Sequence, residues 1–356
     1  MRILQLLNHT RRLNGHVHAA VDLACAQAKL GHQVAVASSG GDFDRLLASN
    51  NVETMQVSIE RQPKKLVDGV SRLYRLVRDW RADVVHAHMM TSAVLAWPIC
   101  KLLKIPLVTT VHNEFEKSAI LMGLGTRVIA VSAAVGNSMR KRGVPQSRIR
   151  VVLNGTIGAA RLEKQDRCPA SLQSPAVVFV GGLHPRKGLP DLFSAFEEVH
   201  RAIQTAHLYI VGDGPHRAEY VAQVSSMACA EAVIFMGAQD NPFPFLLGAD
   251  VFVLPSHADP APLVLSEARE AGCAIVASNV DGIPEMLDGG RAGILVPTGD
   301  PARLAEVLRS LLEDKQAVLQ WKKNSQINLD FLTIDRVARE TLQIYEEASR
   351  HVHGRA

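Results

Sequence analysis

The 356-residue sequence predicts an α/β protein made of two similar domains, each with a parallel sheet between helices. Short apolar strands alternate with helical segments, and this pattern starts again at Ala176–Val180 after a polar stretch at 159–175. Val251–Leu254 is an unbroken apolar run, as expected for a strand covered on both faces. We therefore predict domains at 1–160 and 161–333, joined by a linker.

The first half opens with a strand–helix–strand unit, and Gly31 is expected to end its helix as a C-terminal cap. Gly15 stands where the first loop enters the helix, so it either allows close backbone approach to a ligand or is a plain turn glycine. The strands are expected at Arg2–Leu7, Gln33–Ser38, Asp83–His88, Pro106–Val111 and Arg127–Val131, and the helices at about Gly15–Leu30 and Lys64–Trp80. His86 and His88 alternate along one strand and are expected on opposite faces, so they are not expected to bind a metal together.

The second half places glycines directly after its strands. Gly181 and Gly182 follow the first of these strands, Gly214 lies in the turn after His207–Val211, and Gly237 closes Val233–Met236. The adjacent pair Gly181 and Gly182 lets the backbone approach a ligand closely. Two final helices are expected at about Pro301–Asp314 and Ile334–Arg350.

Composition excludes several classes of protein. The apolar content of 47% and aromatic content of 5% suit an aliphatic α/β core. The five cysteines are scattered without a C-x-x-C pair, which argues against a disulfide framework or a zinc site and favours a reducing cytosol. The apolar runs are too short for a signal peptide or a membrane-spanning helix.

Charge is divided unevenly along the chain. Residues 1–160 hold 21 Lys+Arg and 10 Asp+Glu, and the remainder holds 18 and 25. The basic first half includes a stripe of Arg72, Arg75 and Arg78 on one helix face, which Arg61, Lys65 and Arg81 extend. A solvated helix face is the more common explanation, and an anionic membrane surface is the alternative. Nucleic acid is not expected, because no recognition module is present.

The stretch from Val251 to Ser278 carries the strongest functional signal. Its strand is followed by a proline-containing loop and a helix that we expect to begin at Pro262. The amides of Leu263, Val264 and Leu265 would then face a phosphate, and two carboxylates, Asp259 and Glu267, would bind sugar or ribose hydroxyls. An ordinary strand–loop–helix capped by Asp259 is the alternative.

This stretch resembles the signature of the retaining glycosyltransferases of the GT-B fold, family 4. Asp259, seven residues, Glu267 and the strand Gly-Cys-Ala-Ile-Val-Ala-Ser follow the family's order. Other ordered pieces extend the resemblance over nearly the whole chain: ADVVHAH, IPLVTTVHN, VVLNG, GGLHPRKG and DGIPE. The chain departs from the family pattern at Asp259 (usually Glu), at Pro260–Pro262 (usually Gly-Phe-Gly) and at Gly182 (usually Arg).

The resemblance implies two Rossmann-like domains facing each other across a cleft, with the helix at about 334–350 packing back on the first domain. The first domain would bind the acceptor through the loops at Thr91–Ala96 and Asn113–Leu124, and the second would bind the nucleotide sugar. His112 would contact the donor sugar, Lys187 the diphosphate and Glu267 the ribose, while Asp259 would bind a sugar hydroxyl. Arg186 either supplies the charge that Gly182 lacks or points to solvent. Further donor contacts are expected at Gly15, Gly181, Gly182, Gly214, Met236, Gly237, Ala261, Pro262, Leu263 and Val264.

The implied reaction is metal-independent transfer of a hexose from a UDP- or GDP-sugar to a glycan or lipid-linked acceptor, without pyridoxal phosphate. A role in cell-surface polysaccharide or glycolipid assembly follows, with the protein in the cytoplasm or at the inner face of the membrane. Three alternatives stay open: a nucleotide-sugar epimerase, a phosphorylase and a catalytically degenerate partner protein.

Overall fold

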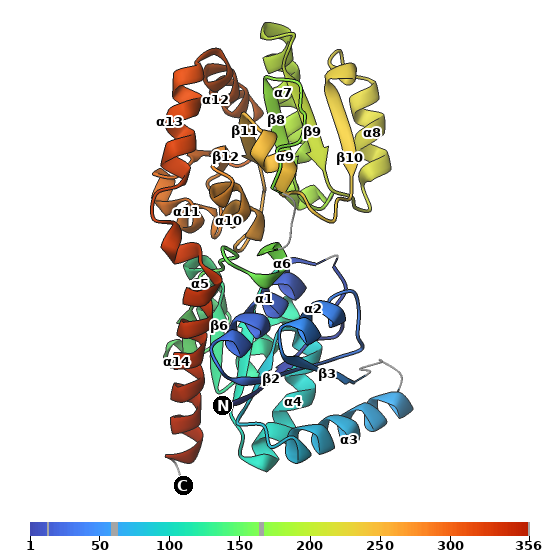
Figure 1. Cartoon of the computed structure of the whole chain (residues 1–356), viewed down its shortest axis with the longest axis vertical. Coiled ribbons are helices and arrows are strands. Elements are labelled where there is room, and N and C mark those ends of the chain that lie inside the picture. The colour runs from blue at the N-terminus through green and yellow to red at the C-terminus, as the bar shows by residue number, and fades with distance from the viewer. Residues whose placement is uncertain (13, 58–62, 164–166, 355–356) are drawn as a thin grey trace. The chain divides into compact units, whose positions relative to one another are not determined.

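The computed structural model describes residues 1–12, 14–57, 63–163 and 167–354. Two compact units divide the chain (Figure 1): unit 1 comprises Met1–Lys164 with Asp330–Ala356, and unit 2 comprises Gln165–Leu329. The predicted divisions after residues 160 and 333 fall four residues before and four residues after these boundaries. Arg61, the side chain of Lys65 and linker residues 164–166 lie outside the described part.

Unit 1 is built on a sheet whose seven described strands are all parallel, in the order β3-β2-β1-β4-β5-β6-β7. The strands are β1 (Arg2–Leu6), β2 (Gln33–Ser38), β3 (Val52–Gln56), β4 (Val84–Ala87), β5 (Leu107–Val111), β6 (Arg127–Ala130) and β7 (Ile149–Val151). The strand order reverses between β1 and β4, and open α/β sheets bind ligands at the carboxyl ends of strands beside such a reversal.

The last helix of the chain belongs to unit 1, where it packs against the first helix. Its buried stripe is Ile334, Ala338, Thr341, Tyr345 and Ala348, at the three- and four-residue spacing of one helix face. The helices of this unit are α1 (Gly15–Lys29), α2 (Asp44–Ser49), α3 (Pro63–Asp79), α4 (Met90–Leu103), α5 (Ala133–Lys141), α6 (Ala160–Glu163) and α14 (Ile334–His353), with 3-10 turns η1 (Lys117–Leu124) and η2 (Gln146–Arg148).

Unit 2 has a second parallel sheet, with six described strands in the order β10-β9-β8-β11-β12-β13. The strands are β8 (Ala176–Val180), β9 (His207–Val211), β10 (Val233–Gly237), β11 (Val251–Leu254), β12 (Ala274–Ser278) and β13 (Ile294–Val296). Here the order reverses between β8 and β11. The strand that restarts the α/β pattern, β8, and the strand before the proline-containing loop, β11, are therefore neighbours at this reversal.

The helices of unit 2 cover both faces of its sheet in Figure 1. They are α7 (Leu189–Ala202), α8 (Arg217–Ser225), α9 (Phe243–Gly248), α10 (Leu263–Glu270), α11 (Ile283–Met286), α12 (Pro301–Glu313) and α13 (Lys315–Ser325), with 3-10 turns η3 (Pro185–Lys187), η4 (Ala230–Ala232), η5 (Asp288–Gly290) and η6 (Leu329–Leu332), the last of which spans the second unit boundary.

The prediction of two α/β units with parallel sheets is confirmed. The sequence analysis missed α13, which buries only Val318 and Ser325 and therefore has a weak apolar period. It also missed β3, an edge strand with mostly exposed side chains. No helix in the described ranges is long and apolar enough to cross a membrane.

Candidate active site

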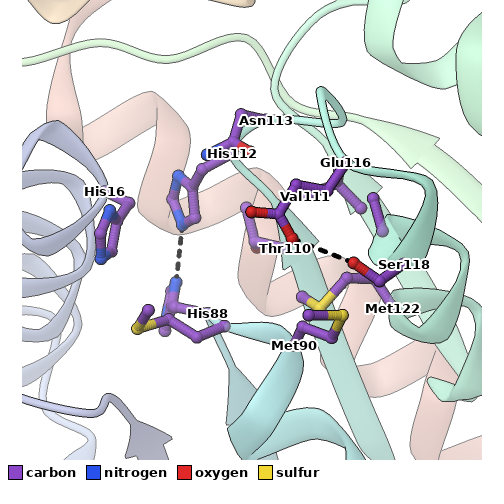
Figure 2. A pocket seen from close by; sticks show the side chains of 12 residues that line it. His16, His88, Met90, Thr110, Val111, His112, Asn113, Glu116, Ser118 and Met122 are labelled. Carbon is purple, nitrogen blue, oxygen red and sulfur yellow. Dashed lines mark hydrogen bonds between the residues drawn. The ribbon is translucent and has the colours of Figure 1, made fainter.

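Three histidines of unit 1 come from the carboxyl ends of neighbouring strands. His16 lies one residue into α1, just after the loop that leaves β1, while His88 directly follows β4 and His112 directly follows β5. Because β1, β4 and β5 are adjacent and parallel, these side chains meet at one edge of the sheet. Figure 2 shows the three rings beside one another.

These histidines line a pocket of about 210 Å³ in unit 1 (Figure 2). Its remaining lining comes from β5, the loop after β5, η1 and the start of α4: Met89, Met90, Thr110, Val111, Asn113, Glu116, Ser118, Ala119 and Met122. The pocket therefore combines apolar walls with a few polar groups, as ligand pockets commonly do.

Hydrogen bonds hold His88 and His112 in fixed orientations, whereas His16 Nε2 is buried without a hydrogen-bond partner among the described residues. His88 Nδ1 lies 3.0 Å from His112 Nε2, and His88 Nε2 lies 2.7 Å from Gln5 Oε1. The rings of His86 and His88 have centroids 4.2 Å apart, so the prediction that they face opposite sides was wrong. Residues two apart in a strand lie on the same face, so the alternation itself places His86 and His88 side by side, and the prediction misapplied it.

Burial keeps these imidazoles neutral at pH 7. Desolvation is the largest cause in each case: it lowers the pKa of His86 to about 3 and that of His16 to about 4. The pKa values of His88 and His112 are also held well below the usual value, first by burial and then by neighbouring histidines. Neutral histidines can each accept a hydrogen bond through one ring nitrogen and donate through the other.

The loop after His112 is held from the neighbouring helix. The Arg142 guanidinium donates to the Glu116 carbonyl at 2.8 Å and also to the Glu114 carbonyl. Within the loop, Ser118 Oγ donates to Glu116 Oε2 at 3.1 Å. One wall of the pocket is thus tied to the end of α5.

Gly15, a predicted donor contact, is exposed at the first position of α1, with open space where a Cβ would lie.

Lys187 and Asp259 are brought together in unit 2, although 72 positions separate them. Lys187 ends η3 after β8, Asp259 lies in the loop after β11, and Lys187 Nζ is 2.5 Å from Asp259 Oδ2. Ser256 Oγ donates to the same carboxylate oxygen at 3.3 Å, and the Asp259 amide donates to Asp281 Oδ2 at 2.8 Å. The lysine side chain is 17% exposed and the aspartate 10%, so the pair is shielded but reachable.

Two glycines at this edge permit close backbone packing. Gly188 has φ +66°, and a Cβ there would overlap the Pro255 carbonyl oxygen. Gly212 has φ +138°, and a Cβ there would overlap the Gly181 carbonyl oxygen. The amide of Gly212 also donates to the Gly237 carbonyl at 2.8 Å. The ends of β8, β9 and β10 are therefore drawn together by backbone contacts that larger residues would prevent.

Helix α10 begins one residue later than predicted. Pro262 is its N-cap with extended backbone angles, so Leu263 is the first helical residue. The Leu265 amide donates to the Pro262 carbonyl at 3.1 Å, which corrects the prediction that it faces a ligand. The amides of Leu263 and Val264 keep the first-turn position, where the helix itself offers no acceptor. Glu267 lies in the next turn and is 7% exposed.

The other predicted donor contacts lie near the carboxyl edge of unit 2. Gly182 is exposed after β8, and the Arg186 carbonyl accepts the His257 amide at 2.7 Å. Gly214 packs against Leu183, such that a Cβ would lie 2.7 Å from the Leu183 amide nitrogen. The remaining predicted contacts are Met236 and Gly237 at the end of β10, and the buried Ala261 before α10.

The predicted basic stripe is exposed on α3 of unit 1: Arg72, Arg75 and Arg78. Arg78 is paired with Asp79 at 2.7 Å. Arg72 and Arg75 line a shallow groove with Met55, Leu76, Asp79 and Trp80. The groove therefore presents apolar groups together with two arginines and one carboxylate.

The sequence analysis overlooked the pocket histidines other than His112, together with Gln5 and Thr110. The available signal was the presence of polar residues inside otherwise apolar strands, since Gln5 and His86 are fully buried. Among the described residues, no group of three or more His, Cys, Asp or Glu is placed to bind a metal.

Comparisons with known proteins agree with this architecture. The family model described as Glycosyltransferase Family 4 matches residues 13–156, and the one described as Glycosyl transferases group 1 matches residues 174–314. A glycogen synthase of Mycobacterium tuberculosis is 31% identical over 296 residues, which cover 77% of this chain and 70% of that protein. The N-acetyl-alpha-D-glucosaminyl L-malate synthase of Bacillus anthracis is 25% identical, over 81% of this chain and 82% of the other.

Solved structures share the fold. The Anabaena protein HepE in complex with UDP-glucose superposes with a TM-score of 0.81 at 20% identity, covering 98% of this chain and 99% of that one. WaaG, a glycosyltransferase involved in lipopolysaccharide biosynthesis, superposes with a TM-score of 0.73 at 16% identity, covering 99% and 100%. The chain belongs to the glycosyltransferases of the GT-B fold.

Proposed function

We propose that this protein is a retaining family 4 hexosyltransferase that uses a UDP- or GDP-sugar. The observation that carries the proposal is the Lys187–Asp259 ion pair at the β8/β11 reversal, beside the start of α10. A cation and first-turn amides form the kind of site that binds a diphosphate. The UDP-glucose in the HepE structure supports the choice of donor class.

The chemistry follows from the charge that develops as the anomeric bond breaks. Negative charge grows on the diphosphate, and Lys187 with the amides of Leu263 and Val264 would stabilise it. Asp259, released from Lys187, would accept a hydrogen bond from a sugar hydroxyl, and Glu267 would bind the ribose. A diphosphate oxygen would take the acceptor's proton, so no side chain is assigned as general base and no metal or pyridoxal phosphate is required.

His112 and its pocket would contact the sugar of the donor, and the loop at 113–124 would contact the acceptor. The acceptor would be a glycan or lipid-linked molecule in cell-surface polysaccharide or glycolipid assembly, a role for which the likeness to WaaG, a glycosyltransferase involved in lipopolysaccharide biosynthesis, gives support. Arg72, Arg75 and Arg78 would hold the protein at the anionic inner face of the membrane. Arg186 would supply the charge that Gly182 lacks at the diphosphate.

The test is a hydrolysis and transfer screen of the purified full chain with UDP-, GDP-, ADP- and dTDP-sugars, read by NMR of the released sugar. The expected result is turnover of one UDP- or GDP-sugar with retention at the anomeric carbon. Inversion would overturn the retaining assignment. Conversion of the nucleotide sugar without an acceptor into its epimer would replace the transferase with an epimerase.

A catalytically degenerate partner protein is the second candidate, favoured by Gly182 and by Pro260–Pro262, which depart from the family pattern. It predicts no turnover with any donor, and normal glycan assembly in cells that carry Lys187→Ala.

A further inference from the structure

A buried polar network runs from the last helix of the chain to the floor of the unit 1 pocket. It consists of Gln5, Gln27, His86, His88 and Tyr345, of which all but His88 are fully buried. Its members come from β1, α1, β4, the residue after β4 and α14. Because His88 of this network contacts His112, the network reaches a side chain that lines the pocket.

The Tyr345 hydroxyl is the junction of the network. It lies 3.2 Å from Gln5 Nε2, 3.1 Å from Gln27 Nε2 and 2.6 Å from His86 Nδ1. A phenol has one proton, so it donates once and accepts otherwise. When both carboxamide nitrogens donate to the hydroxyl oxygen, its proton goes to His86 Nδ1, and all three contacts are satisfied.

The opposite orientation of the carboxamides leaves a repulsive contact. Rotating Gln5 alone would put its oxygen 2.7 Å from Gln27 Oε1. Rotating both would put two carbonyl oxygens at the Tyr345 hydroxyl, which has a single proton to give. The hydroxyl could donate to only one of these two oxygens, and the other would face the Tyr345 oxygen with no proton between them. Tyr345 therefore selects the orientation in which Gln5 Oε1 faces His88.

The orientation of Gln5 determines where the proton of each histidine lies. Gln5 Oε1 can only accept, so His88 donates from Nε2 and its Nδ1 is an acceptor. His112 must then donate from Nε2 to His88 Nδ1 across 3.0 Å. The second nitrogen of His112, Nδ1, is left as an acceptor for a ligand of the pocket.

We propose that Gln5, Gln27 and Tyr345 are positioning residues that hold the proton of His112 on Nε2, so that its Nδ1 accepts a hydrogen bond from a ligand hydroxyl. The assignment of that hydroxyl to the donor sugar rests on the proposed function. The tautomer of His112 rests only on the hydrogen bonds of the network. The network makes His112 selective for a group that donates a proton and unfavourable for a phosphate or carbonyl oxygen.

The direct test is NMR of the full chain with 15N-labelled histidine, in which two-bond correlations distinguish the protonated from the bare ring nitrogen. The chain has 14 histidines, and His112→Gln identifies the signal of His112 by its disappearance. At pH 7 the expected pattern is a single tautomer with the proton on Nε2. A proton on Nδ1, or a rapid average of both tautomers, would overturn the proposal.

Two variants test the network. Tyr345→Phe removes the hydroxyl that selects the orientation of Gln5, so His112 should become a mixture of tautomers. Gln5→Met removes the acceptor of His88, so His88 should donate from Nδ1 and move the His112 proton to Nδ1. The matched control is Tyr220→Phe in unit 2, where the hydroxyl is buried without a hydrogen-bond partner among the described residues. An unchanged His112 pattern in both network variants would overturn the positioning role.

The ligand is tested by adding UDP-glucose or UDP to the same samples. A hydroxyl that donates to His112 Nδ1 should move that nitrogen's resonance with UDP-glucose and leave it in place with UDP. The same shift with UDP alone would overturn the assignment of Nδ1 to a sugar hydroxyl. Absence of binding by either compound, with the proton still on Nε2, would count against the proposed donor and in favour of the network.

Discussion

The carboxyl edges of the two sheets carry different chemical groups. At the edge of unit 1 the histidines are neutral, and His86, His88 and His112 are held by hydrogen bonds from their own unit. The edge of unit 2 carries a shielded ion pair, first-turn amides and glycine turns. Prearranged neutral imidazoles suit recognition of hydroxyls, whereas the charged edge suits a group whose negative charge grows during reaction. The difference predicts different sensitivities to mutation, pH and charge.

The largest effect is expected at Lys187. Lys187→Ala should lower the transfer rate by about 10²–10³-fold, because one donor to the developing charge is lost. The measurement is kcat and KM with the donor found in the screen. Lys315→Ala, at an exposed lysine of α13 in the same unit, is the matched control and should leave the rate unchanged. If Lys187→Ala kept the full rate, the charged edge would have no catalytic role.

The second effect concerns the stability of unit 2. Arg269 of α10 is fully buried and donates to the carbonyls of Ser325, Met286 and Ile327. Burial lowers its pKa to about 10, which leaves it charged at neutral pH. Arg269→Ala should destabilise the unit by roughly 3 kcal/mol, because two buried carbonyls and a third, partly buried one lose their donor. The loss of stability is measured as the urea concentration at the midpoint of unfolding, followed by Trp321 fluorescence. Arg217→Ala, at an exposed arginine, is the control. Equal midpoints for the two variants would contradict the stabilising role of Arg269.

The third effect distinguishes the edges by pH. The pKa of His86 is about 3 in the fold and about 6.5 when unfolded, so the unfolded chain binds the extra proton between these values. Stability of unit 1 should therefore be fully present above pH 6.5 and fall below it by about 1.4 kcal/mol per pH unit for each such histidine. His16, with a pKa of about 4, adds to the slope.

Tryptophan positions allow each unit to be followed separately between pH 7 and pH 5. Trp321→Phe leaves Trp80 and Trp97, both in unit 1, while the double Trp80→Phe and Trp97→Phe variant leaves Trp321 in unit 2. Unit 2 should show the smaller slope, because His184 at its edge is exposed whereas His86 in unit 1 is fully buried. Equal slopes in the two units would contradict the contrast between the edges.

The smallest effect is expected for the basic stripe of α3. Changing Arg72, Arg75 and Arg78 to Glu should weaken sedimentation with anionic vesicles about tenfold and leave neutral vesicles unaffected. Changing Arg291, Arg303 and Arg309 of unit 2 to Glu alters the net charge equally and is the matched control. A similar loss in both variants would assign the binding to net charge instead of to α3.

The sequence predicted those features that depend on local patterns. Apolar strands, glycine turns and the spacing of Asp259 and Glu267 led to the sheets and to the charged edge of unit 2. The pocket of unit 1 was only partly predictable, because His16, His88 and Gln5 become neighbours through the order of the strands. Tyr345 could not be predicted, because it joins the network only through the packing of α14 in unit 1. Its hydroxyl is one of two in the buried helix stripe, with that of Thr341, and nothing in the sequence distinguishes them.

The most direct test of the contrast between the two edges is calorimetric titration of UDP-glucose and GDP-mannose into the full chain and into Lys187→Ala. A phosphate site built on Lys187 predicts that one of these donors binds the wild-type chain and that the variant binds it at least tenfold more weakly, since a buried charged contact to the diphosphate is lost. Equal affinities of the two proteins for that donor, or binding of neither donor to the wild-type chain, would contradict it.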